Sequence, residues 1–446
     1  MAGAKVAVIG GGLAGLCAAS ELSARGFEVA LFEREPSPGG RAGSEREKDF
    51  GFEPGAHAIA SSDRRLLALV ARAGLAGELL PLRPLALAQV ERGRAFRIHP
   101  ESPRGVARIP GVGRLARLRL ARLPRLLARY APVLDPDAPE RAASRDDRSV
   151  ADFVRLYFGS RALERWIGPW LADTSLCDPA ETSRVLALEL LAFRRHAWLG
   201  SLRGDLAVLA GTLAGSVGAR CGVAVRALEP RGAGLLVHCA GPDGEGVAEA
   251  DAVVLAVPPP DVLAVAADLL SSAELDVLRA RRGVPALGLA LGLESPLARH
   301  ATRIRVPARE GFPFATLVLE PGVPGGRLPE GRGLAVLLGG ADPRALDVAD
   351  ERVASRWIAA LDALLPGAAA RVAWSRVHRW ASAFPRFDVG DFRAIARLRR
   401  AEADARTRGR RLYLAGDHLS GPTLEAAVAS GQRAAAAVAE DLAPPA

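Results

Sequence analysis

The sequence predicts an α/β fold organised around a parallel sheet, and three stretches of the 446-residue chain support this prediction. An apolar run near the N-terminus, residues 6–9, precedes a glycine-rich turn and a helical pattern. Two further apolar runs occupy residues 251–257 in the middle of the chain and residues 412–415 near its end. Short apolar runs that stop at glycine or proline are typical of strands buried on both faces of a parallel sheet.

The first apolar run leads into a glycine motif of dinucleotide-binding type. Gly10, Gly12 and Gly15 have the spacing G-x-G-x-x-G. In a Rossmann-like turn the first glycine allows the bend, the second lets backbone approach a pyrophosphate, and the third lets helix pack on strand. The helix expected over residues 13–24 directs its N-terminus at the phosphates, and Glu33 ends the next strand, where a carboxylate can bind a ribose hydroxyl. The alternative is a structural turn, and the motif alone does not separate NAD from FAD.

Two other segments carry polar groups that suit such a site. Gly40 and Arg41 belong to a Gly-Gly-Arg loop, which fits either a second phosphate contact or a plain surface turn. Asp417 follows the C-terminal strand and can deliver a carboxylate to a ribityl or phosphate group. The helix expected from Leu424 begins at Thr423, where its N-terminus can stabilise negative charge on a reduced flavin ring. A nicotinamide enzyme does not need this distant contact, so the C-terminal segment favours FAD.

Composition and charge argue against several classes of function. The net charge is +9, but only two of the 59 basic residues are lysines and acidic residues are interspersed, so a GC-rich genome explains the excess better than nucleic-acid binding. The four cysteines form no C-x-x-C pair, so we expect neither disulfides nor a metal site, and a reducing, cytoplasmic compartment fits. No apolar run reaches the roughly 18 residues of a spanning helix. The first strand begins too early to leave room for a signal peptide.

The region between residues 61 and 199 has a different, mainly helical pattern. We expect a helix over residues 66–80 and another from Ser149, an N-cap residue with Asp152 three positions later. Residues 104–130 alternate arginine with leucine, which suits either a core-facing helix pair with solvated arginines or contact with an anionic membrane surface. The first of these interpretations is favoured.

Taken in order, four motifs resemble those of the FAD-dependent amine oxidase and desaturase superfamily. They are the glycine turn with Glu33, the Gly39–Arg41 loop, DAVVLAVPP at 251–259, and AGDHLSGPTLEAAVASG at 415–431. The resemblance implies FAD and a discontinuous Rossmann-like FAD-binding domain, with an α+β substrate domain inserted twice. The expected FAD-binding domain comprises residues 1–60, 201–275 and 395–446, and the expected substrate domain comprises residues 61–200 and 276–394. The residues assigned to the cofactor are Gly10, Gly12, Leu13, Ala14, Gly15, Glu33, Arg34, Gly40, Arg41, Gly55, Ala56, His57, Val225, Ala256, Trp380, Gly416, Asp417, Thr423, Leu424 and Ala427.

Within the superfamily, residues 149–183 and 378–392 are similar to protoporphyrinogen oxidase, whereas the C-terminal flavin loop looks like that of squalene-associated and carotenoid desaturases. Residues 173–177 depart from the protoporphyrinogen oxidase pattern near the expected substrate site. Many amine oxidases of the superfamily place a lysine near the flavin, but the lysines here are Lys5 and Lys48, in the predicted FAD-binding domain.

The resemblance implies an oxidase or desaturase that takes hydride from a large apolar substrate such as a porphyrinogen or an isoprenoid. The alternatives are an amine oxidase or a sugar mutase-like flavoenzyme on the same scaffold, and a non-enzymatic binder. No side chain is assigned as an acid or base. Side chains that either line the pocket or simply pack are His57, Asp173, Arg379 and Trp380. Phe384 and Phe387 either stack on the flavin or substrate or belong to an aromatic core.

Overall fold

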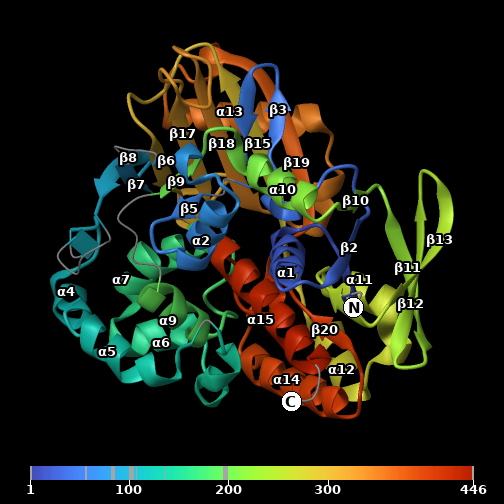
Figure 1. The fold of residues 1–446 in the computed structure, drawn as a ribbon. Coiled ribbons are helices and arrows are strands. Elements are labelled where there is room, and N and C mark those ends of the chain that lie inside the picture. The colour runs from blue at the N-terminus through green and yellow to red at the C-terminus, as the bar shows by residue number, and fades with distance from the viewer. Residues whose placement is uncertain are drawn as a thin grey trace.

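The computed structural model describes residues 3–55, 58–81, 86–99, 105–106, 108–135, 137–193 and 199–443. Figure 1 shows a smaller sheet with its helices on one side of the molecule, a larger sheet above it, and a group of helices beside both. Ala56 and His57, two of the predicted cofactor contacts, lie outside the described residues.

A five-stranded parallel sheet forms from segments of the beginning, middle and end of the chain. Its strand order is β10-β2-β1-β14-β20, and every neighbouring pair is parallel. The strands are β1 (Lys5–Ile9), β2 (Glu28–Glu33), β10 (Arg220–Cys221), β14 (Ala252–Leu255) and β20 (Leu412–Leu414). The three apolar runs therefore lie side by side, as predicted.

The two faces of this sheet are covered by different helices, because alternate side chains of a strand point to opposite faces. Val6 and Val8 pack into a core with α1 (Leu13–Ala24), α2 (Arg64–Arg72), α10 (Asp205–Ser216) and α15 (Leu424–Leu442). Ala7 and Ile9 pack on the opposite face with α11 (Pro259–Ala266), α12 (Ser272–Ala280), α14 (Asp391–Thr407) and the antiparallel sheet β11 (Ala224–Arg231), β12 (Gly234–Gly241) and β13 (Gly244–Ala250).

Helix α15 lies directly against α1, as Figure 1 shows in red and blue. A Cβ atom at Gly431 would lie far inside van der Waals distance of the Ala14 carbonyl oxygen. Glycine at this position therefore lets the two helices approach closely, which links the C-terminal segment to the glycine turn.

The second large sheet has seven strands in the order β19-β15-β18-β17-β16-β7-β8. All its pairs are antiparallel except β16 with β7. Helix α13 (Asp350–Leu364) packs on one face through residues such as Trp357 and Leu361. The strands are β7 (Ala86–Glu91), β8 (Arg94–Ile98), β15 (Gly283–Leu293), β16 (Thr302–Arg305), β17 (Thr316–Pro321), β18 (Gly333–Gly340) and β19 (Val372–Pro385).

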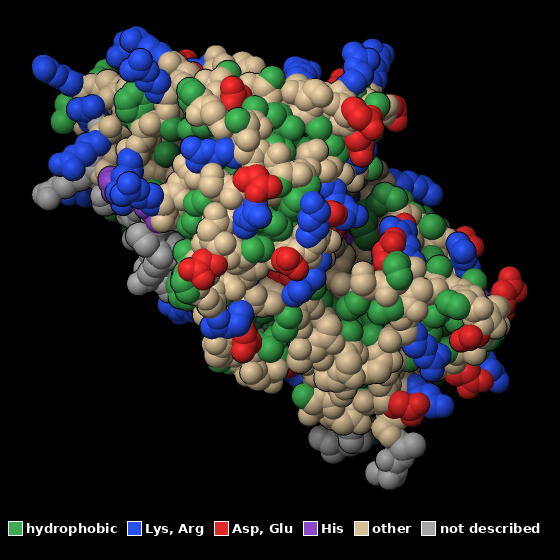
Figure 2. Space-filling view, turned by 90° about the horizontal axis from the view of Figure 1, so that it is seen from above, with side chains coloured by type: hydrophobic (Ala, Val, Ile, Leu, Met, Phe, Trp, Pro, Cys, Tyr) green, Lys and Arg blue, Asp and Glu red, His purple; other side chains and the backbone are tan. Residues whose placement is uncertain are grey.

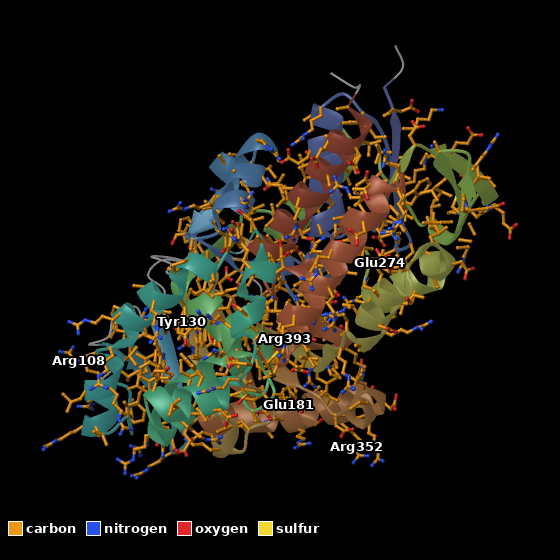
Figure 3. All side chains as sticks on the ribbon, turned by 90° about the horizontal axis from the view of Figure 1, so that it is seen from below. Arg108, Tyr130, Glu181, Glu274, Arg352 and Arg393 are labelled. Atoms are coloured by element: carbon orange, nitrogen blue, oxygen red, sulfur yellow. The ribbon has the colours of Figure 1, made fainter. Side chains whose placement is uncertain are left out.

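A helical layer lies beside both sheets and has its own apolar core. The Ser149 hydroxyl caps the first turn of α6 by accepting from the Asp152 N–H at 3.1 Å, as predicted. Figure 3 shows Tyr130 among these helices and the exposed Arg108 at their outer edge. The elements are α4 (Arg114–Leu120), α5 (Leu123–Tyr130), α6 (Val150–Tyr157), α7 (Ser160–Ala162), η5 (Leu163–Ile167), α8 (Gly168–Ser175) and α9 (Arg184–Phe193).

Short strands and helical turns connect these layers. The strands are β3 (Glu45–Glu47), β4 (Phe50–Phe52), β5 (Ile59–Ala60), β6 (Leu79–Pro81) and β9 (Leu199–Leu202). The turns are η1 (Gly40–Ala42), η2 (Ala76–Glu78), η3 (Ala131–Val133), η4 (Pro139–Arg145), η6 (Ala267–Leu269), η7 (Ala308–Glu310), η8 (Pro343–Asp347), η9 (Ala369–Arg371) and η10 (Asp417–Leu419).

The helix predicted over residues 66–80 is wrong in its length. Helix α2 ends at Arg72, and residues 79–81 form β6. Gly74 has a φ of +75°, a left-handed conformation that stops the helix and redirects the chain. Leu66, Leu69 and Val70 pack in the core of α1 and α15, although the prediction placed residues 61–200 in the substrate domain.

The arginine-rich stretch forms the two short helices α4 and α5. Ala116, Leu120, Leu126 and Leu127 are buried in the core of the helical layer, which agrees with the favoured interpretation of a core-facing helix pair. Leu115 and Leu118 of α4 are 61% and 73% exposed, so contact with an anionic membrane surface stays a prediction.

Within the described ranges, we find no helix that is both long and apolar enough to span a membrane. Figure 2 shows one face of the molecule, on which basic, acidic and hydrophobic side chains are interspersed.

Candidate active site

The glycine turn between β1 and α1 has no room for side chains at two of its three glycines. Gly10 has a φ of +104°, and a Cβ atom there would lie 2.6 Å from the Ala256 carbonyl oxygen. A Cβ atom at Gly15 would collide with the Gly10 carbonyl oxygen and also meet Ala256. The turn is therefore packed against the end of β14, which brings the predicted residue Ala256 to the site.

Gly12 is different, because a Cβ atom built there meets nothing within 4 Å. It is the N-cap residue of α1, provides no side chain to cap the helix, and is followed by a first turn without acidic residues. The N–H groups of Leu13 and Ala14, in that first turn, point out of the start of a helix, where an anion is favoured. This uncapped helix start beside open space fits the pyrophosphate of a dinucleotide.

Glu33 is fixed beside the same turn at the end of β2. Glu33 is 8% exposed as a residue, and its carboxylate accepts hydrogen bonds from the N–H groups of Gly11 at 2.5 Å and Glu35 at 2.8 Å. Its carbonyl oxygen accepts from the Val223 N–H at 2.8 Å, so the start of β11, with Val225, lies next to it. This arrangement suits the contacts of Glu33 with ribose and of Val225 with adenine, which stay predictions.

Arg34, the neighbouring predicted residue, points to the surface. Its guanidinium pairs with Asp261 at 3.0 Å, and its side chain is 59% exposed. Asp261 lies in the first turn of α11, so Arg34 links the end of β2 to the start of that helix.

The Gly-Gly-Arg loop brings the two ends of the chain together. The Gly39 N–H donates to the Gly11 carbonyl oxygen at 2.8 Å, and Gly40, at a φ of +54°, lies against Gly12. Arg41 then forms an ion pair with Asp417 at 2.7 Å. The loop is therefore not a plain surface turn, because it joins the N-terminal glycine turn to the C-terminal segment.

The segment around Asp417 is held by the helix that follows it. The Gly416 N–H donates to the Ser430 hydroxyl at 3.0 Å. His418 is buried beside Asp417, and this burial lowers the pKa of the imidazole to about 3, although Asp417 opposes the shift. His418 is therefore neutral near physiological pH and leaves the charge balance of the Arg41–Asp417 pair unchanged.

Helix α15 begins at Thr423, whose hydroxyl accepts from the Ala426 N–H at 3.0 Å, and the Ala427 N–H donates to the Thr423 carbonyl oxygen. Glu425 in the first turn accepts from the backbone N–H groups of Arg65 and Leu66 at the start of α2, both at 2.9 Å. Burial raises the pKa of Glu425 despite these hydrogen bonds. Sequence analysis missed this carboxylate, because its partners are backbone groups that carry no sequence signal.

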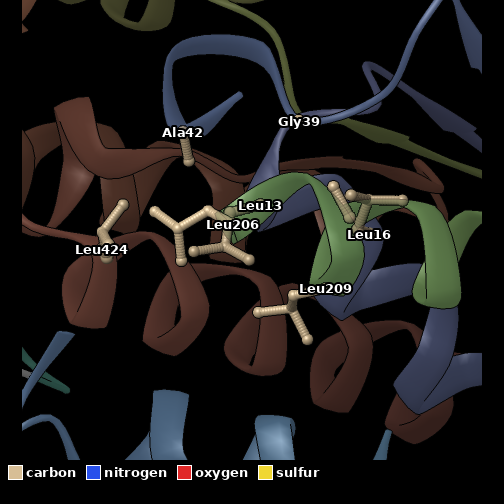
Figure 4. Close-up of a pocket in the computed structure, with 8 residues that line it drawn as sticks. Leu13, Leu16, Gly39, Ala42, Leu206, Leu209 and Leu424 are labelled. Atoms are coloured by element: carbon tan, nitrogen blue, oxygen red, sulfur yellow. The ribbon is translucent and has the colours of Figure 1, made fainter. Parts of the chain in front are cut away.

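Two predicted cofactor residues point into a small apolar cavity at the junction of α1, α10 and α15. Figure 4 shows Leu13 and Leu424 converging there with leucines of α10. These side chains fix the relative positions of the helix starts, so any contact with phosphate or flavin falls to their backbone. The cavity is lined by Leu13, Leu16, Gly39, Ala42, Leu206, Leu209, Ala210 and Leu424.

A larger cavity lies between the two predicted domains. The predicted FAD-binding domain contributes Gly55, Ala58 and residues 422–424 at the start of α15, and the substrate side contributes mainly apolar side chains and one charged cluster. Asp173 and Phe384 were among the predicted lining residues, and both line it. The remaining lining residues are Leu87, Trp170, Thr174, Leu199, Arg303, Arg305 and Leu338.

The charged cluster in this cavity consists of Asp173 from α8 and two arginines from β16. The Asp173 carboxylate lies 2.8 Å from Arg303 Nε and 3.1 Å from Arg305 Nε, and it accepts from the Thr316 hydroxyl at 2.9 Å. Burial alone would raise the pKa of Asp173, but the two guanidinium groups and these hydrogen bonds hold it below its usual range. Asp173 is therefore an ionised carboxylate. The arginines escaped sequence analysis because nothing distinguishes them from the many others.

Trp380 is not among the residues that line this cavity. It stacks on His378, with ring centroids 5.8 Å apart and an interplanar angle of 23°. A Cβ atom at Gly288 would lie 2.9 Å from the indole ring, so the ring packs on the backbone of β15.

Two other candidate pocket residues do not line this cavity. Arg379 points to the η8 region, where it donates to the Leu346 carbonyl oxygen at 2.8 Å and pairs with Asp350 at 2.5 Å. Phe387 is fully buried against Phe392, and the Arg281 guanidinium lies 4.8 Å from its ring centroid. Arg379 and Phe387 therefore make structural contacts elsewhere in the fold and do not line this cavity.

Among the residues that the structure describes, no group of three or more histidine, cysteine, aspartate or glutamate side chains is arranged to hold a metal ion. Both lysines are exposed, and Lys48 lies in the turn between β3 and β4.

Comparison with known proteins places this geometry in a family. The chain is 29% identical over 281 residues to a Mycobacterium tuberculosis protein provisionally named flavin-containing monoamine oxidase AofH, an alignment that covers 59% of each chain. It is 25% identical over 185 residues to protoporphyrinogen oxidase 2 of Arabidopsis thaliana, covering 41% of this chain and 35% of the relative. The chain thus spans less than two thirds of the length of these curated relatives.

The fold matches solved structures over its whole length. One is the crystal structure of an Exiguobacterium protein provisionally named protoporphyrinogen oxidase, with a TM-score of 0.76, 18% identity and complete coverage of both chains. Residues 13–439 match the family described as flavin containing amine oxidoreductase. With the cradle formed by the glycine turn, Glu33 and Asp417, this match shows that the chain belongs to the flavin-containing amine oxidoreductases and uses FAD.

Proposed function

We propose that this FAD-dependent oxidoreductase is an oxidase or desaturase that removes hydride from a C–H bond of a large apolar substrate, such as a porphyrinogen or an isoprenoid. The main support for this proposal is the cavity that reaches from the start of α15 to the seven-stranded sheet. Its apolar side chains are Leu87, Trp170, Leu199, Leu338 and Phe384. Burial of an apolar substrate against them would supply binding free energy of about 25 cal/mol per Å² of apolar surface.

The chain's own residues bind and orient rather than exchange protons. Bound FAD supplies the hydride acceptor. The uncapped start of α1 fits the pyrophosphate, and the Arg41–Asp417 pair joins the two segments that enclose the cofactor. The N-terminus of α15 at Thr423 lies at the cavity, where its dipole favours negative charge on the reduced cofactor. No side chain is assigned as a general acid or base.

An amine oxidase is the main alternative, and a sugar mutase-like flavoenzyme is a further one. The name of the Mycobacterium tuberculosis relative favours amines. The positions of the lysines favour the oxidase or desaturase, because both lysines are exposed and neither lines the described cavity. The superfamily's amine oxidases commonly place a lysine near the flavin, so its absence from the cavity lining supports a substrate that is not an amine.

Anaerobic reduction of the purified holoenzyme tests this proposal. A porphyrinogen, a polyene, and a panel of mono- and diamines are each mixed with the yellow protein, and loss of the flavin absorbance is recorded. We expect bleaching by the porphyrinogen or the polyene and none by the amines. Bleaching by amines alone would overturn the proposal and support an amine oxidase. Protein that stays colourless after incubation with FAD would support a binder without flavin chemistry.

A further inference from the structure

Helix α8, which provides three of the residues that line the cavity, is preceded by the π turn η5. The Gly168 N–H donates to the carbonyl oxygen of Leu163, five positions earlier, whereas in an α-helix it would donate to the carbonyl oxygen four positions earlier. The π turn therefore adds one residue to the helical path. Because an α-helix has 3.6 residues per turn, one added residue rotates the helix that follows by about 100° about its axis.

Pro169 explains why the regular helix is interrupted at this point. Proline has no N–H, so Pro169 cannot donate to the carbonyl oxygen of Arg165, four positions earlier, or to that of Glu164, five positions earlier. Both oxygens accept from side chains outside the helix instead. Gln89 Nε2 of β7 donates to the Arg165 oxygen at 2.8 Å, and Arg309 Nη1 of η7 donates to the Glu164 oxygen at 2.6 Å. The π turn is therefore fixed from outside the helical layer.

The sheet places Gln89 for this contact. Gln89 lies on β7 between Leu87, which lines the cavity, and Glu91, and these alternate side chains share one face of the sheet. Glu91 accepts from the guanidinium groups of Arg165 and Arg309, so β7 holds the π turn through two side chains. Gln89 is 1% exposed, and its Oε1 atom is buried with no hydrogen-bond partner among the described residues, so the amide acts through Nε2.

The cavity-lining residues of α8 follow the π turn at helical spacing. Trp170, Asp173 and Thr174 occupy positions i, i+3 and i+4, so they lie on one face of the helix. Leu171 lies on another face and is fully buried in the core of the helical layer. Without the added residue, α8 would be rotated by about 100° relative to the helices before it, and this face would turn away from the cavity.

We infer that the π turn and Gln89 select the shape of the substrate, because they hold α8 in the rotation that turns Trp170 to the cavity. Gln89 and Pro169 are positioning residues, since neither lines the cavity. The inference rests on the proposed function, which takes this cavity as the substrate site, and it narrows the apolar substrate class. An indole ring packs best on another π system, so Trp170 favours a flat, conjugated body over a saturated one.

Two uncharged ligands with one carbon skeleton test the inference. The probes are 2-naphthol, which is flat and aromatic, and decahydro-2-naphthol, which is saturated and puckered. Binding to the oxidised holoenzyme is measured by perturbation of the flavin spectrum and by titration calorimetry, and the selectivity is the ratio of the two association constants. Trp170→Leu should lower this ratio by roughly twofold to tenfold, the factor that corresponds to one aromatic contact.

Gln89→Leu removes the donor to the Arg165 carbonyl oxygen with little change in volume. It should lower the selectivity in the same direction as Trp170→Leu, and the double variant should lose no more than the larger single loss, because both changes act on one contact. It should also lower the Tm, since a buried carbonyl oxygen loses its partner. Thr182→Val is the matched control. Thr182 is buried in the helical layer, does not line the cavity and donates to the Asp178 carbonyl oxygen at 2.7 Å, so this variant should lower the Tm and leave the selectivity unchanged.

Pro169→Ala separates positioning from stability. The new N–H can donate to the Arg165 carbonyl oxygen, so adding Pro169→Ala to Gln89→Leu should restore the Tm. The same hydrogen bond continues a regular α-helix and changes the rotation of α8, so the selectivity should stay low. If Gln89→Leu does not fold, Pro169→Ala alone tests the same expectation, because its N–H competes with Gln89 for the Arg165 oxygen.

Failure of both ligands to bind, or a selectivity that Trp170→Leu and Gln89→Leu leave unchanged, would overturn the inference. Additive losses in the double variant would show that Gln89 does not act through Trp170 and would overturn it as well. Recovery of selectivity together with the Tm on adding Pro169→Ala would assign the π turn a purely structural role. These measurements do not depend on turnover. A holoenzyme that is bleached by a polyene but keeps its selectivity in Gln89→Leu would retain the proposed function and lose the inference.

Discussion

The cofactor cradle and the substrate cavity meet at the start of α15 but are built by different physical means. The cradle consists mainly of backbone, glycines and helix N-termini, together with the carboxylates of Glu33 and Asp417, and at Gly15 even one methyl group collides with backbone. The cavity consists of large apolar side chains and the cluster of Arg303, Arg305 and Asp173. Backbone geometry suits a cofactor that never changes, whereas side chains can be exchanged without altering the fold. The cofactor side should therefore respond most to added volume, and the substrate side most to changed charge.

The largest expected effect is at Gly15. Gly15→Ala forces a Cβ atom into the Gly10 carbonyl oxygen, so we expect a loss of about 3 kcal/mol in the free energy of unfolding, together with loss of flavin. Urea unfolding of the apoprotein and the flavin-to-protein ratio measure the two effects. Gly211→Ala is the control, since a Cβ atom at that α10 position meets nothing within 4 Å and should be tolerated. Equal stability of the two variants would contradict the conclusion that backbone packing excludes a side chain at Gly15.

Gly12→Val should separate cofactor binding from folding. The new side chain points into open space and the φ of −71° suits any residue, so stability should change by no more than about 1 kcal/mol, the scale of an altered N-cap. Most of the bound flavin should nevertheless be lost, because the side chain fills the space beside the free N–H groups of α1. Flavin content and thermal unfolding of the apoprotein are the measurements. Full flavin occupancy would count against the pyrophosphate position.

A buried charge should also affect the stability of the helical layer, away from the cavity. Glu189 of α9 tests this expectation. Its Oε1 atom is buried without a hydrogen-bond partner in the described part of the chain, and burial raises the pKa of this carboxyl well above its ordinary value, with a smaller contribution from Asp135. The folded protein therefore holds a proton that the unfolded chain releases, so stability falls as pH rises above the ordinary carboxyl range.

Glu189→Gln should thus stabilise the protein by about 1–3 kcal/mol at neutral pH, because the neutral amide avoids the cost of protonating a buried carboxyl, and have little effect in acid. Chemical unfolding at several pH values measures the difference. Glu164→Gln is the control, because Glu164 is exposed and its replacement should be neutral at every pH. A difference from wild type that is independent of pH would show that ionisation of Glu189 is not the cause.

The smallest effect on stability is expected at the surface of α4. Combining Leu115→Ser with Leu118→Ser should change the free energy of unfolding by less than about 0.5 kcal/mol, because both side chains are largely exposed. If the arginine-rich helices contact anionic membranes, cosedimentation with phosphatidylserine vesicles should fall. Leu156→Ser, at an equally exposed leucine of α6, should leave it unchanged. Wild-type protein that does not sediment with these vesicles would refute the membrane contact.

The sequence predicted the strand, turn and helix of the glycine motif well because their signals are local. The strand, the three glycines, the helix and Glu33 occupy one continuous stretch, and each is constrained by backbone geometry that only certain residues allow. The small residues that follow Thr423 likewise indicate a close helix contact, and Gly431 provides it. The ion pair of Arg41 with Asp417 was not predicted, because 376 positions separate the two residues in the sequence.

The substrate side was less predictable because its signals are not local. Asp173 and Arg303 lie 130 positions apart and meet only through the packing of α8 on β16. No pattern marks Arg303 or Arg305 among the many arginines of this chain. The overlong helix prediction beyond Arg72 has a local cause, since the leucine pattern continued while the left-handed Gly74 ended the helix.

The position of β1 between β2 and β14, with α15 against α1, has a consequence for biosynthesis. While the ribosome is still making the middle of the chain, the glycine turn has no Asp417 to face and no C-terminal helix to cover α1. The nascent protein must therefore keep an incomplete, apolar surface protected until its last segment emerges. Flavin should therefore bind only after α15 has been made, and truncation before Asp417 should leave the glycine turn without bound flavin.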